Sequence, residues 1–546
     1  MKPKILFASP IGPYTKLALK EDPIDFFYYR NTFGQKMFQL RSFQSWHSLH
    51  FLAQNIAVDS VVLENPTMKI FQKEIHNGEY EIIAIGFTIL LTKKVLEMVE
   101  WIKLNFPAIE IVIGGYGTAV FTESFETSDK LKNMVNYISY GEGLELMNSI
   151  IKHKWNINNN NKVLRQDLLP AKNSFFRTHI EIFQQIVLVG GLGCVFGCSF
   201  CATSSQFNKK YIPLFTGKQL FDSLCEQRKK HPTIKSAIIY DEDFLLNRRQ
   251  VLEFIECFKN SELQNSGMLL TIFASLKSLL NFSREELIDC GVGSIFIGVE
   301  SLSEEVLKRE GLTKRKGEVE DIFRQLHSYG INTIGSLIIG WDSQNLMLAK
   351  SDSERFINMN PTFYQVVPLH IVPGTKLWDE MKLAERVLPN YKVEFDGITD
   401  FNFEAKSFSH HEARDLVFKT YDGLVKEGGP WPFRFFENLL YGYLNLKEKN
   451  EANLFNRAKI YKSMLPATFI LAFASRYFFF GKNYRYRWNQ SMRKFIKHSP
   501  MLFFLGTVIS PFVAFLLLVI WFYGNIKFLF SRKGDQPDFI RREYFS

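Results

Sequence analysis

Short runs rich in Val and Ile alternate with amphipathic segments through most of this 546-residue chain. Before residue 155 the strand-like runs cover residues 4–10, 60–66, 81–87, 109–115 and 137–143. Helix-like apolar spacing occurs over residues 45–56, 91–106 and 144–153. Because strands and helices alternate in this order, residues 1–155 predict an α/β domain with a doubly wound parallel sheet.

The carboxyl ends of the strands form the ligand-binding edge of such a sheet. In this chain those positions are rich in glycine, which lets a ligand approach the backbone closely. Any one of these glycines could equally be an ordinary turn residue, but together they favour a ligand site. The candidate residues are Gly12, Thr88, Gly114, Gly115, Gly141, Glu142 and Gly143.

A polar, Asn-rich stretch at residues 156–162 indicates a domain boundary, and we assign residues 156–180 to a linker. Residues 181–400 then repeat the alternation of strands and helices. Six strand–helix units predict a partial parallel (β/α)6 barrel, with its chemistry on the loops that follow the strands. The six strand-like runs are 184–191, 235–244, 268–275, 293–300, 331–342 and 362–374.

Three of the six cysteines, Cys194, Cys198 and Cys201, follow the first of these strands with the spacing C-x3-C-x2-C. Three thiolates can hold three irons of a 4Fe-4S cluster and leave the fourth iron free for a substrate. A structural zinc site is one alternative, but it requires four ligands, and no fourth Cys or His lies nearby in the sequence. A redox-active cysteine pair is another. The preceding strand and the following strand–helix pattern favour the cluster.

The cysteine motif in this context resembles the radical SAM enzymes. The segments IIYDEDFLLN, GVESLSEEVLKREGLTK, IGSLIIGWD and PLHIVPGTKLWDEM are similar to the family's second, fourth, fifth and sixth strand elements. The resemblance implies that S-adenosylmethionine binds the free iron and is cleaved to a 5′-deoxyadenosyl radical. It also implies S-adenosylmethionine contacts from Asp241, Asp243, Glu300 and Ser301, with Gly335 and Ile338 near the adenine. An acidic residue at a strand end can instead be a helix cap.

The N-terminal sheet resembles the cobalamin-binding domain of one large branch of that family, through the segments VIGGYGTAV and YISYGEGLEL. The D-x-H-x-x-G motif that supplies a histidine to cobalt is absent from the sequence, so the resemblance implies cobalamin without that ligand. A Rossmann-like domain that has lost its cofactor is the alternative. With both cofactors, the implied reaction is methyl transfer to an unactivated carbon.

Other activities stay open at this point. Some members of the branch close rings, couple carbons or oxidise their substrates without methylation. A membrane-tethered cobalamin and iron–sulfur sensor or electron-transfer protein is a second functional class. The resemblance further implies an electron donor such as flavodoxin or ferredoxin.

The C-terminal part of the chain has a different pattern. Residues 401–460 predict a helical extension, and residues 461–546 predict a membrane-associated region. Residues 501–523 carry no charge over a length that could span a bilayer. Basic residues on both sides favour a re-entrant or monotopic hairpin at Pro511, with both flanks at anionic headgroups on the cytoplasmic face, over a single kinked span. These flanks hold Arg485, Arg487, Arg493, Lys494, Lys497, Lys527, Arg532, Lys533, Arg541 and Arg542.

Membrane attachment favours a hydrophobic or lipid-like substrate, although the segment could also be an anchor alone. The net charge is +10, but the basic residues gather near the C-terminus rather than on a face interleaved with aromatic residues. We therefore expect no nucleic-acid partner. The N-terminal apolar run ends at Pro10 and is too short for a secretory signal, so we expect the protein at the cytoplasmic face of a membrane.

Overall fold

The computed structural model describes residues 4–14, 27–159, 163–175, 180–312, 319–388, 401–407, 409–530 and 539–543. The first sheet contains the five strands expected near the N-terminus, all parallel, in the order β3-β1-β4-β5-β6. They are β1 (Lys4–Ala8), β3 (Asp59–Glu64), β4 (Ile82–Gly86), β5 (Glu110–Gly114) and β6 (Tyr137–Ile138). A sixth strand from the far end of the chain, β16 (Phe539–Glu543), pairs antiparallel with β3 at the sheet edge.

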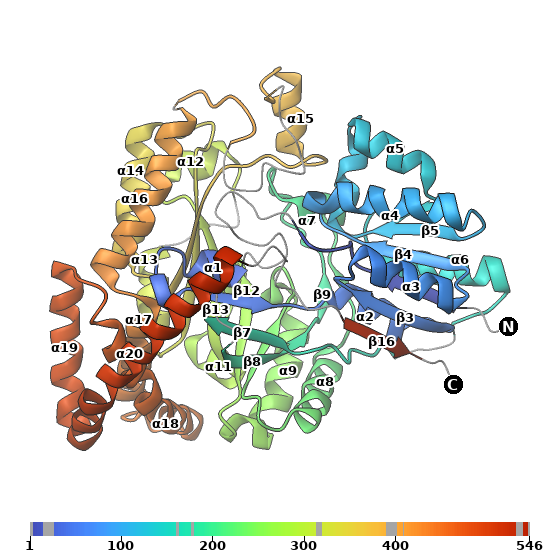
Figure 1. Ribbon diagram of the computed structural model, residues 1–546. Helices are drawn as coiled ribbons and strands as arrows, with labels where there is room; N and C mark the ends of the chain where they lie inside the picture. The colour runs from blue at the N-terminus through green and yellow to red at the C-terminus, as the bar shows by residue number, and fades with distance from the viewer. Residues whose placement is uncertain are drawn as a thin grey trace.

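Helices cover both faces of this sheet, as the alternation of apolar residues on its strands requires. On one face, Phe7 and Val112 pack with α2 (His47–Gln54) and α6 (Gly143–Trp155). On the other face, Leu6 and Ile83 pack with α3 (Met68–Gly78), α4 (Thr92–Asn105) and α5 (Glu126–Met134). Figure 1 shows this domain on the right, beside the second sheet.

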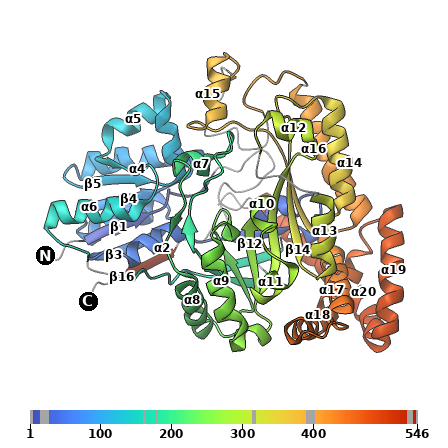
Figure 2. The same cartoon turned by 180° about the vertical axis from the view of Figure 1, so that it is seen from behind.

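The second sheet contains all six predicted barrel strands, parallel and in sequence order, and it curls into a half-barrel (Figure 1). They are β8 (Glu181–Leu188), β11 (Ser236–Ile239), β12 (Leu269–Ala274), β13 (Val292–Glu300), β14 (Asn332–Ile339) and β15 (Phe363–Pro368). Figure 2 shows its outer helices, namely α8 (Gly217–Lys230), α9 (Arg248–Lys259), α11 (Arg284–Asp289), α13 (Val319–Ser328) and α14 (Leu346–Met359). Shorter helices follow several strands: α7 (Ala202–Gln206), α10 (Leu276–Leu279), α12 (Glu304–Arg309) and α15 (Lys376–Leu383).

Two antiparallel strands that the sequence did not predict extend the half-barrel beyond β8. The strand β7 (Ala171–Phe175) lies within the segment expected to be a linker, and it pairs with β8. The strand β2 (Leu40–Phe43) comes from the N-terminal part of the chain and pairs with β7. Between β1 and α2 the chain therefore leaves the first sheet, forms α1 (Phe27–Asn31), η1 (Lys36–Phe38) and β2, and returns. The two sheets are consequently tied together by the chain itself.

The C-terminal region is helical, with α16 (His410–Gly428), α17 (Trp431–Leu446), α18 (Ala452–Ser475), α19 (Lys482–His498) and α20 (Pro500–Phe530). The second half of α18 is apolar, and its Leu465 and Phe469 are buried in the core. One helix in the described part of the chain, Pro500–Ile526 within α20, is long and apolar enough to cross a membrane.

The expected hairpin at Pro511 is wrong, because α20 continues through this proline as one helix. Proline lacks an N–H group, so it leaves the carbonyl of Thr507 without its helical partner. A turn in the same apolar stretch would leave several backbone groups unpaired, which costs more in apolar surroundings. The unbroken helix is therefore the less costly arrangement.

Candidate functional site

The three motif cysteines lie on one loop between β8 and α7, above the half-barrel. Cys194 and Cys198 are buried, Cys201 is half-buried beside the first turn of α7, and none of them forms a disulfide. The loop turns at Gly193, whose φ of +80° favours glycine. A Cβ at this position would lie 2.3 Å from the carbonyl oxygen of Lys210. The chain there is folded so tightly that only glycine fits.

This loop suits an iron–sulfur cluster better than a single metal ion. Among the residues that the structure describes, no three Cys, His, Asp or Glu side chains converge as they would around one ion. A 4Fe-4S cluster does not require such convergence, because each thiolate binds a different iron. Phe200, which precedes the last cysteine, packs edge-on against Trp341 after β14, with ring centroids 5.2 Å apart. This contact joins the cysteine loop to the fifth barrel strand.

Two acidic residues follow β11: Asp241 bonds to the start of the cysteine loop, and Asp243 bonds to the segment after β12. Asp241 Oδ1 accepts a hydrogen bond from the N–H of Gly190 at 2.6 Å, whereas Oδ2 is buried without a partner. Burial raises the pKa of Asp241 to about 7. Asp243 Oδ2 accepts bonds from the Ser278 hydroxyl at 2.7 Å and the Ser275 N–H at 3.2 Å. Asp241 therefore has a free buried oxygen that a cationic ligand could use.

The other four residues implied for S-adenosylmethionine have mixed surroundings. Glu300 ends β13 with a φ of +61°, and its carbonyl accepts a bond from the Trp341 indole N–H at 3.2 Å. The buried Ser301 hydroxyl donates to Asp352 at 2.5 Å. A Cβ at Gly335 would meet Phe356 of α14 at 2.9 Å, so this glycine permits close packing of the helix. Ile338 is buried in the core. Ser301 and Gly335 thus have structural partners of their own.

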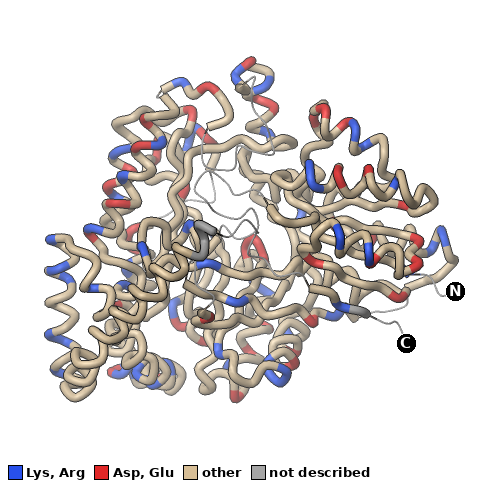
Figure 3. Tube along the Cα trace, in the orientation of Figure 1, with Lys and Arg blue, Asp and Glu red and all other residues tan. Residues whose placement is uncertain are grey.

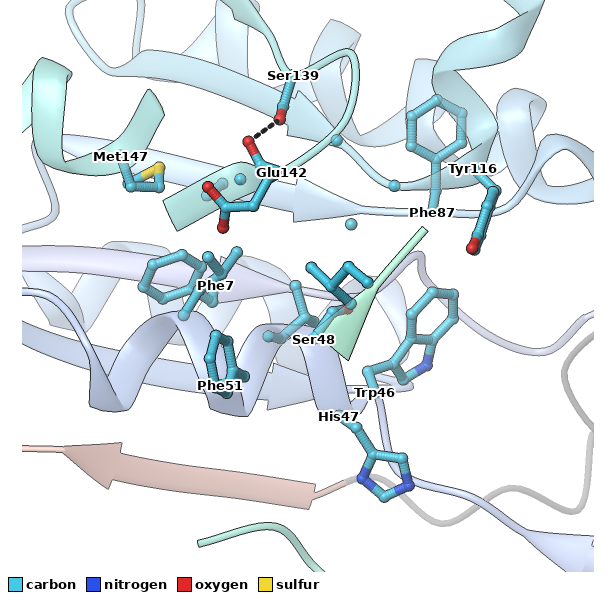
Figure 4. Close-up of a pocket in the computed structure, with 18 of the residues that line it drawn as sticks. Phe7, Trp46, His47, Ser48, Phe51, Phe87, Tyr116, Ser139, Glu142 and Met147 are labelled. Atoms are coloured by element: carbon cyan, nitrogen blue, oxygen red, sulfur yellow. Dashed lines mark hydrogen bonds between the residues drawn. The ribbon is translucent and has the colours of Figure 1, made fainter. Parts of the chain in front are cut away.

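A cavity of about 480 Å³ lies at the carboxyl edge of the first sheet, between that sheet and α2 (Figure 4). This volume is within the range of small-molecule sites, roughly 300–1,000 Å³. Six of the seven residues predicted from the strand ends line it, namely Thr88, Gly114, Gly115, Gly141, Glu142 and Gly143. Gly12 does not line it, because its N–H bonds to the Pro66 carbonyl beside Thr67.

Few polar groups face this largely apolar cavity, and some lack a partner. The buried Thr88 Oγ1 has no hydrogen bond. Glu142 is already used as the N-cap of α6, where it accepts the N–H groups of Leu144 at 2.6 Å and Glu145 at 2.8 Å. Figure 4 shows the bond from the Ser139 hydroxyl to the Glu142 carbonyl on the same wall. A ligand with its own polar groups could therefore bond to Thr88.

The start of α2 supplies cavity residues that the sequence did not reveal, including Trp46, His47 and Ser48. Both ring nitrogens of His47 are buried without partners, and burial lowers its pKa to about 4. In Figure 4 the imidazole points away from the cavity, and its ring lies 5.9 Å from that of Tyr240 in the half-barrel. The segment SWHSLH reads as an ordinary amphipathic helix start, so only the fold assigns these residues to the cavity.

Tyr116 connects the cavity with the cysteine loop. It follows Gly115 in η3 (Tyr116–Thr122) and lines the cavity. Its hydroxyl donates to Glu242 Oε1 at 2.9 Å and accepts from the Thr203 hydroxyl at 3.2 Å. The other oxygen of Glu242 accepts the N–H of Gly193 at 2.9 Å. Burial raises the pKa of the Tyr116 hydroxyl well above its usual value, and the charge of Glu242 adds to this. The two candidate sites are therefore one continuous region.

Comparisons with known proteins agree with this arrangement. The family model of the Radical SAM superfamily matches residues 188–347, which include the three cysteines. An uncharacterized methyltransferase of Pyrococcus horikoshii is 22% identical over 322 residues, covering 58% of this chain and 67% of that protein. The bacteriochlorophyllide d C-8(2)-methyltransferase of Chlorobaculum tepidum is 22% identical over 225 residues, covering 38% of this chain and 46% of that protein.

Solved structures show the same fold over most of the chain. The radical S-adenosylmethionine methyltransferase TsrM of Kitasatospora setae, solved with cobalamin and a 4Fe-4S cluster bound, matches with a TM-score of 0.55 and 13% identity. The match covers 86% of this chain and all of that one. The cobalamin-dependent radical enzyme OxsB, solved with aqua-cobalamin and S-adenosylmethionine, matches with a TM-score of 0.53 and 14% identity over 87% of this chain and 72% of that one. Residues 188–347 of this chain therefore match a radical SAM domain, and most of the chain has the fold of these solved cobalamin-dependent radical enzymes.

Proposed function

We propose that this enzyme is a cobalamin-dependent methyltransferase that acts on a carbon of a hydrophobic or lipid-like substrate. The observation that carries the proposal is the shared wall between the two candidate sites, where Tyr116 lines the cavity and bonds through Glu242 to the cysteine loop. The proposed methylation requires both cofactors to reach the same substrate. The shared wall would bring their two candidate sites close enough for this.

The residues of the cysteine loop fit the first cofactor. Cys194, Cys198 and Cys201 would hold three irons, and the packing of Phe200 on Trp341 would exclude water from one side of the loop. The unpaired oxygen of Asp241 would accept a bond from the ammonium group of S-adenosylmethionine. When bound, the cluster and S-adenosylmethionine supply a 5′-deoxyadenosyl radical, and cobalamin supplies a methyl group.

The cavity residues fit a large cofactor that is partly buried. Thr88 offers an unpartnered hydroxyl, and the glycines leave space along the strand ends. At Gly115 the φ is +90°, and a Cβ would lie 2.8 Å from the carbonyl oxygen of Phe87. A side chain there would close the approach to the backbone. The protein's task at this site is to bind and orient the cofactor and to exclude water.

Two observations support an apolar substrate. The described part of the chain contains a long apolar helix, and a relative is named as a bacteriochlorophyllide d C-8(2)-methyltransferase. An electron donor such as flavodoxin or ferredoxin would supply reducing electrons. The competing proposals are a radical enzyme that closes rings, couples carbons or oxidises its substrate, and a sensor or electron-transfer protein.

The test is anaerobic reconstitution of the full chain in detergent with iron, sulfide and cobalamin, followed by reductant, S-adenosylmethionine and membrane lipid extract. We expect 5′-deoxyadenosine, a bound-cobalamin spectrum and a lipid product in which a methyl group replaces one hydrogen, a net gain of CH2. Cys198→Ala should abolish 5′-deoxyadenosine but keep the cobalamin spectrum. Cys257→Ala is the matched control, because Cys257 is a half-buried thiol on α9, outside the loop.

A second variant tests the cavity. Thr88→Val preserves the shape of the side chain but removes its hydroxyl, so we expect cobalamin to be retained about three- to tenfold less tightly. Cleavage of S-adenosylmethionine without a methylated product would favour the other radical reactions. Retention of both cofactors without any cleavage, even with lipids present, would refute the enzyme proposal in favour of the sensor.

A further inference from the structure

One face of α20 is exposed and apolar along its whole described length. The exposed side chains recur every three or four residues, which is the spacing of one helix face. Phe512 is 74% exposed and Phe515 is 69% exposed. The face consists of Met501, Phe504, Leu505, Val508, Ile509, Phe512, Phe515, Leu516, Val519, Phe522, Tyr523 and Ile526. At 1.5 Å per residue, this stripe is about 38 Å long. Isolated exposed apolar residues are common, but such a continuous stripe marks an interaction surface.

The opposite face of α20 is packed against the body of the enzyme. Small residues at Gly506, Ser510 and Ala514 allow this close approach. A Cβ at Gly506 would lie 2.2 Å from the Phe469 ring of α18, and Phe503 packs against the same ring with centroids 5.8 Å apart. The helix also contacts α19 and η1. The helix is therefore a fixed part of the enzyme surface rather than a separate anchor.

The chain after α20 returns to the enzyme. The strand β16 pairs with β3 over five residues, from Phe539 opposite Glu64 to Glu543 opposite Ser60. Arg541 also forms an ion pair with Asp167 at 2.9 Å. A helix that crossed a bilayer would leave β16 on the far side from β3. The pairing thus requires both ends of α20 to be on the same side.

The neighbouring helix α19 carries only positive charges. Its sequence contains six Lys or Arg residues and no Asp or Glu. Lys482, Arg485, Arg493, Lys494 and Lys497 are exposed. Figure 3 shows the blue positions along α19 and the tube of α20 that follows it, which carries no charged residue from Pro500 to Ile526. An apolar face with an adjoining basic helix matches the hydrocarbon and the anionic headgroups of one leaflet.

We propose that α20 lies in the plane of an anionic membrane leaflet, with its Phe-rich face in the acyl layer and α19 at the headgroups. The enzyme is thus monotopic and does not span the bilayer. For a cytoplasmic enzyme the partner is the cytoplasmic leaflet. The proposal does not depend on the proposed reaction, because it rests on α19, α20 and β16 alone.

The first test measures binding of the full chain to vesicles by flotation. We expect wild-type protein to float with phosphatidylcholine–phosphatidylglycerol vesicles and to float less with phosphatidylcholine alone. The double variant Phe512→Glu with Phe515→Glu should lose roughly tenfold or more of the binding. The matched control is Leu104→Glu with Leu383→Glu, which adds the same charge at positions 82% and 88% exposed on α4 and α15. Equal binding by the two double variants would overturn the proposal.

The second test measures topology with tags at both ends of the chain in sealed inverted vesicles. We expect an added protease to remove the N-terminal and the C-terminal tag equally. Protection of the C-terminal tag alone would establish a spanning helix and overturn the in-plane arrangement. A dimer that the Phe512→Glu, Phe515→Glu variant dissociates, with vesicle binding unchanged, would also overturn it, since a second copy would then cover the face. Thermal unfolding of each variant in detergent verifies that it is folded.

Discussion

Replacement of Asp241 by asparagine tests the electrostatics of the candidate S-adenosylmethionine site. Burial raises the pKa of Asp241 from 3.8 to about 7, and the side chain is 1% exposed. The folded protein therefore holds the proton more tightly than the unfolded chain between these two values. In that window unfolding releases the Asp241 proton, so the contribution of Asp241 to stability decreases as pH rises from about 4 to 7 and is constant above pH 7. A difference of about three units between the folded and unfolded pKa values changes the free energy of unfolding by on the order of 4 kcal/mol.

Asp241→Asn removes this dependence but keeps an oxygen for the Gly190 N–H. We expect the variant and the wild type to unfold at similar temperatures at pH 4.5, about where the carboxyl is neutral. Near pH 8 the variant should be more stable by several kcal/mol, which is a few degrees in a chain of this size. The assay is scanning calorimetry of cofactor-free protein in detergent across this pH range.

A matched control separates charge from hydrogen bonding. Asp243→Asn alters a carboxylate whose Oδ2 already accepts bonds from Ser275 and Ser278, so it should destabilise the protein even at pH 8. A variant Asp241→Asn with the same pH dependence as the wild type would refute the reasoning. If the ammonium group of S-adenosylmethionine is the missing partner, the ligand should stabilise the wild type at pH 8 more than Asp241→Asn.

Three further outcomes are expected. Tyr116→Phe removes the hydrogen bond to the Glu242 carboxylate, so 5′-deoxyadenosine formation should slow about tenfold. Cobalamin retention, measured on the same protein, should not change. Gly143→Leu places a side chain in the cavity, so equilibrium dialysis should show roughly tenfold weaker cobalamin binding. Equal binding by variant and wild type would show that cobalamin does not bind in this cavity. Arg541→Ala removes a cation that helps to lower the pKa of Asp167 to about 2, so an NMR titration should show a higher pKa for Asp167. Because the same variant loses the ion pair to Asp167, proteolysis of the C-terminal strand should accelerate.

The sequence predicted the parallel strands of both sheets because each is a buried run that alternates with an amphipathic helix. Strand β7, with the sequence AKNSF, and strand β2, with LRSF, have no such pattern. Their pairing joins residues about 130 positions apart, such as Leu40 and Phe175, so no local signal could reveal it. The strands β16 and β3 that pair at the edge of the first sheet are even farther apart in the sequence.

For the candidate site, the sequence could identify residues whose type and spacing alone indicate a ligand or cofactor. The cysteines and the cavity glycines belong to this class. Residues such as Tyr116 and Trp341 were missed, because an aromatic residue after a strand is common and its partners come from distant loops. The assignment of Ser301 and Gly335 to S-adenosylmethionine stays a prediction, and their bonds to Asp352 and packing on Phe356 offer a structural explanation for both.

The contacts between the two sheets bear on how the cofactor sites are held. The chain passes between the two sheets repeatedly: out through α1 and β2, back into α2, out again from α6 to β7, and back at the end into β16. The loops add direct bonds: Tyr116 to Glu242, and Gln206 to the carbonyl of Gly115 at 3.1 Å. These links cross from the first sheet to the cysteine loop itself, so a hinge motion that separated the sheets would also pull on that loop. We therefore infer that the cavity and the cysteine loop keep a fixed position relative to each other, as two cofactors that act on one substrate require.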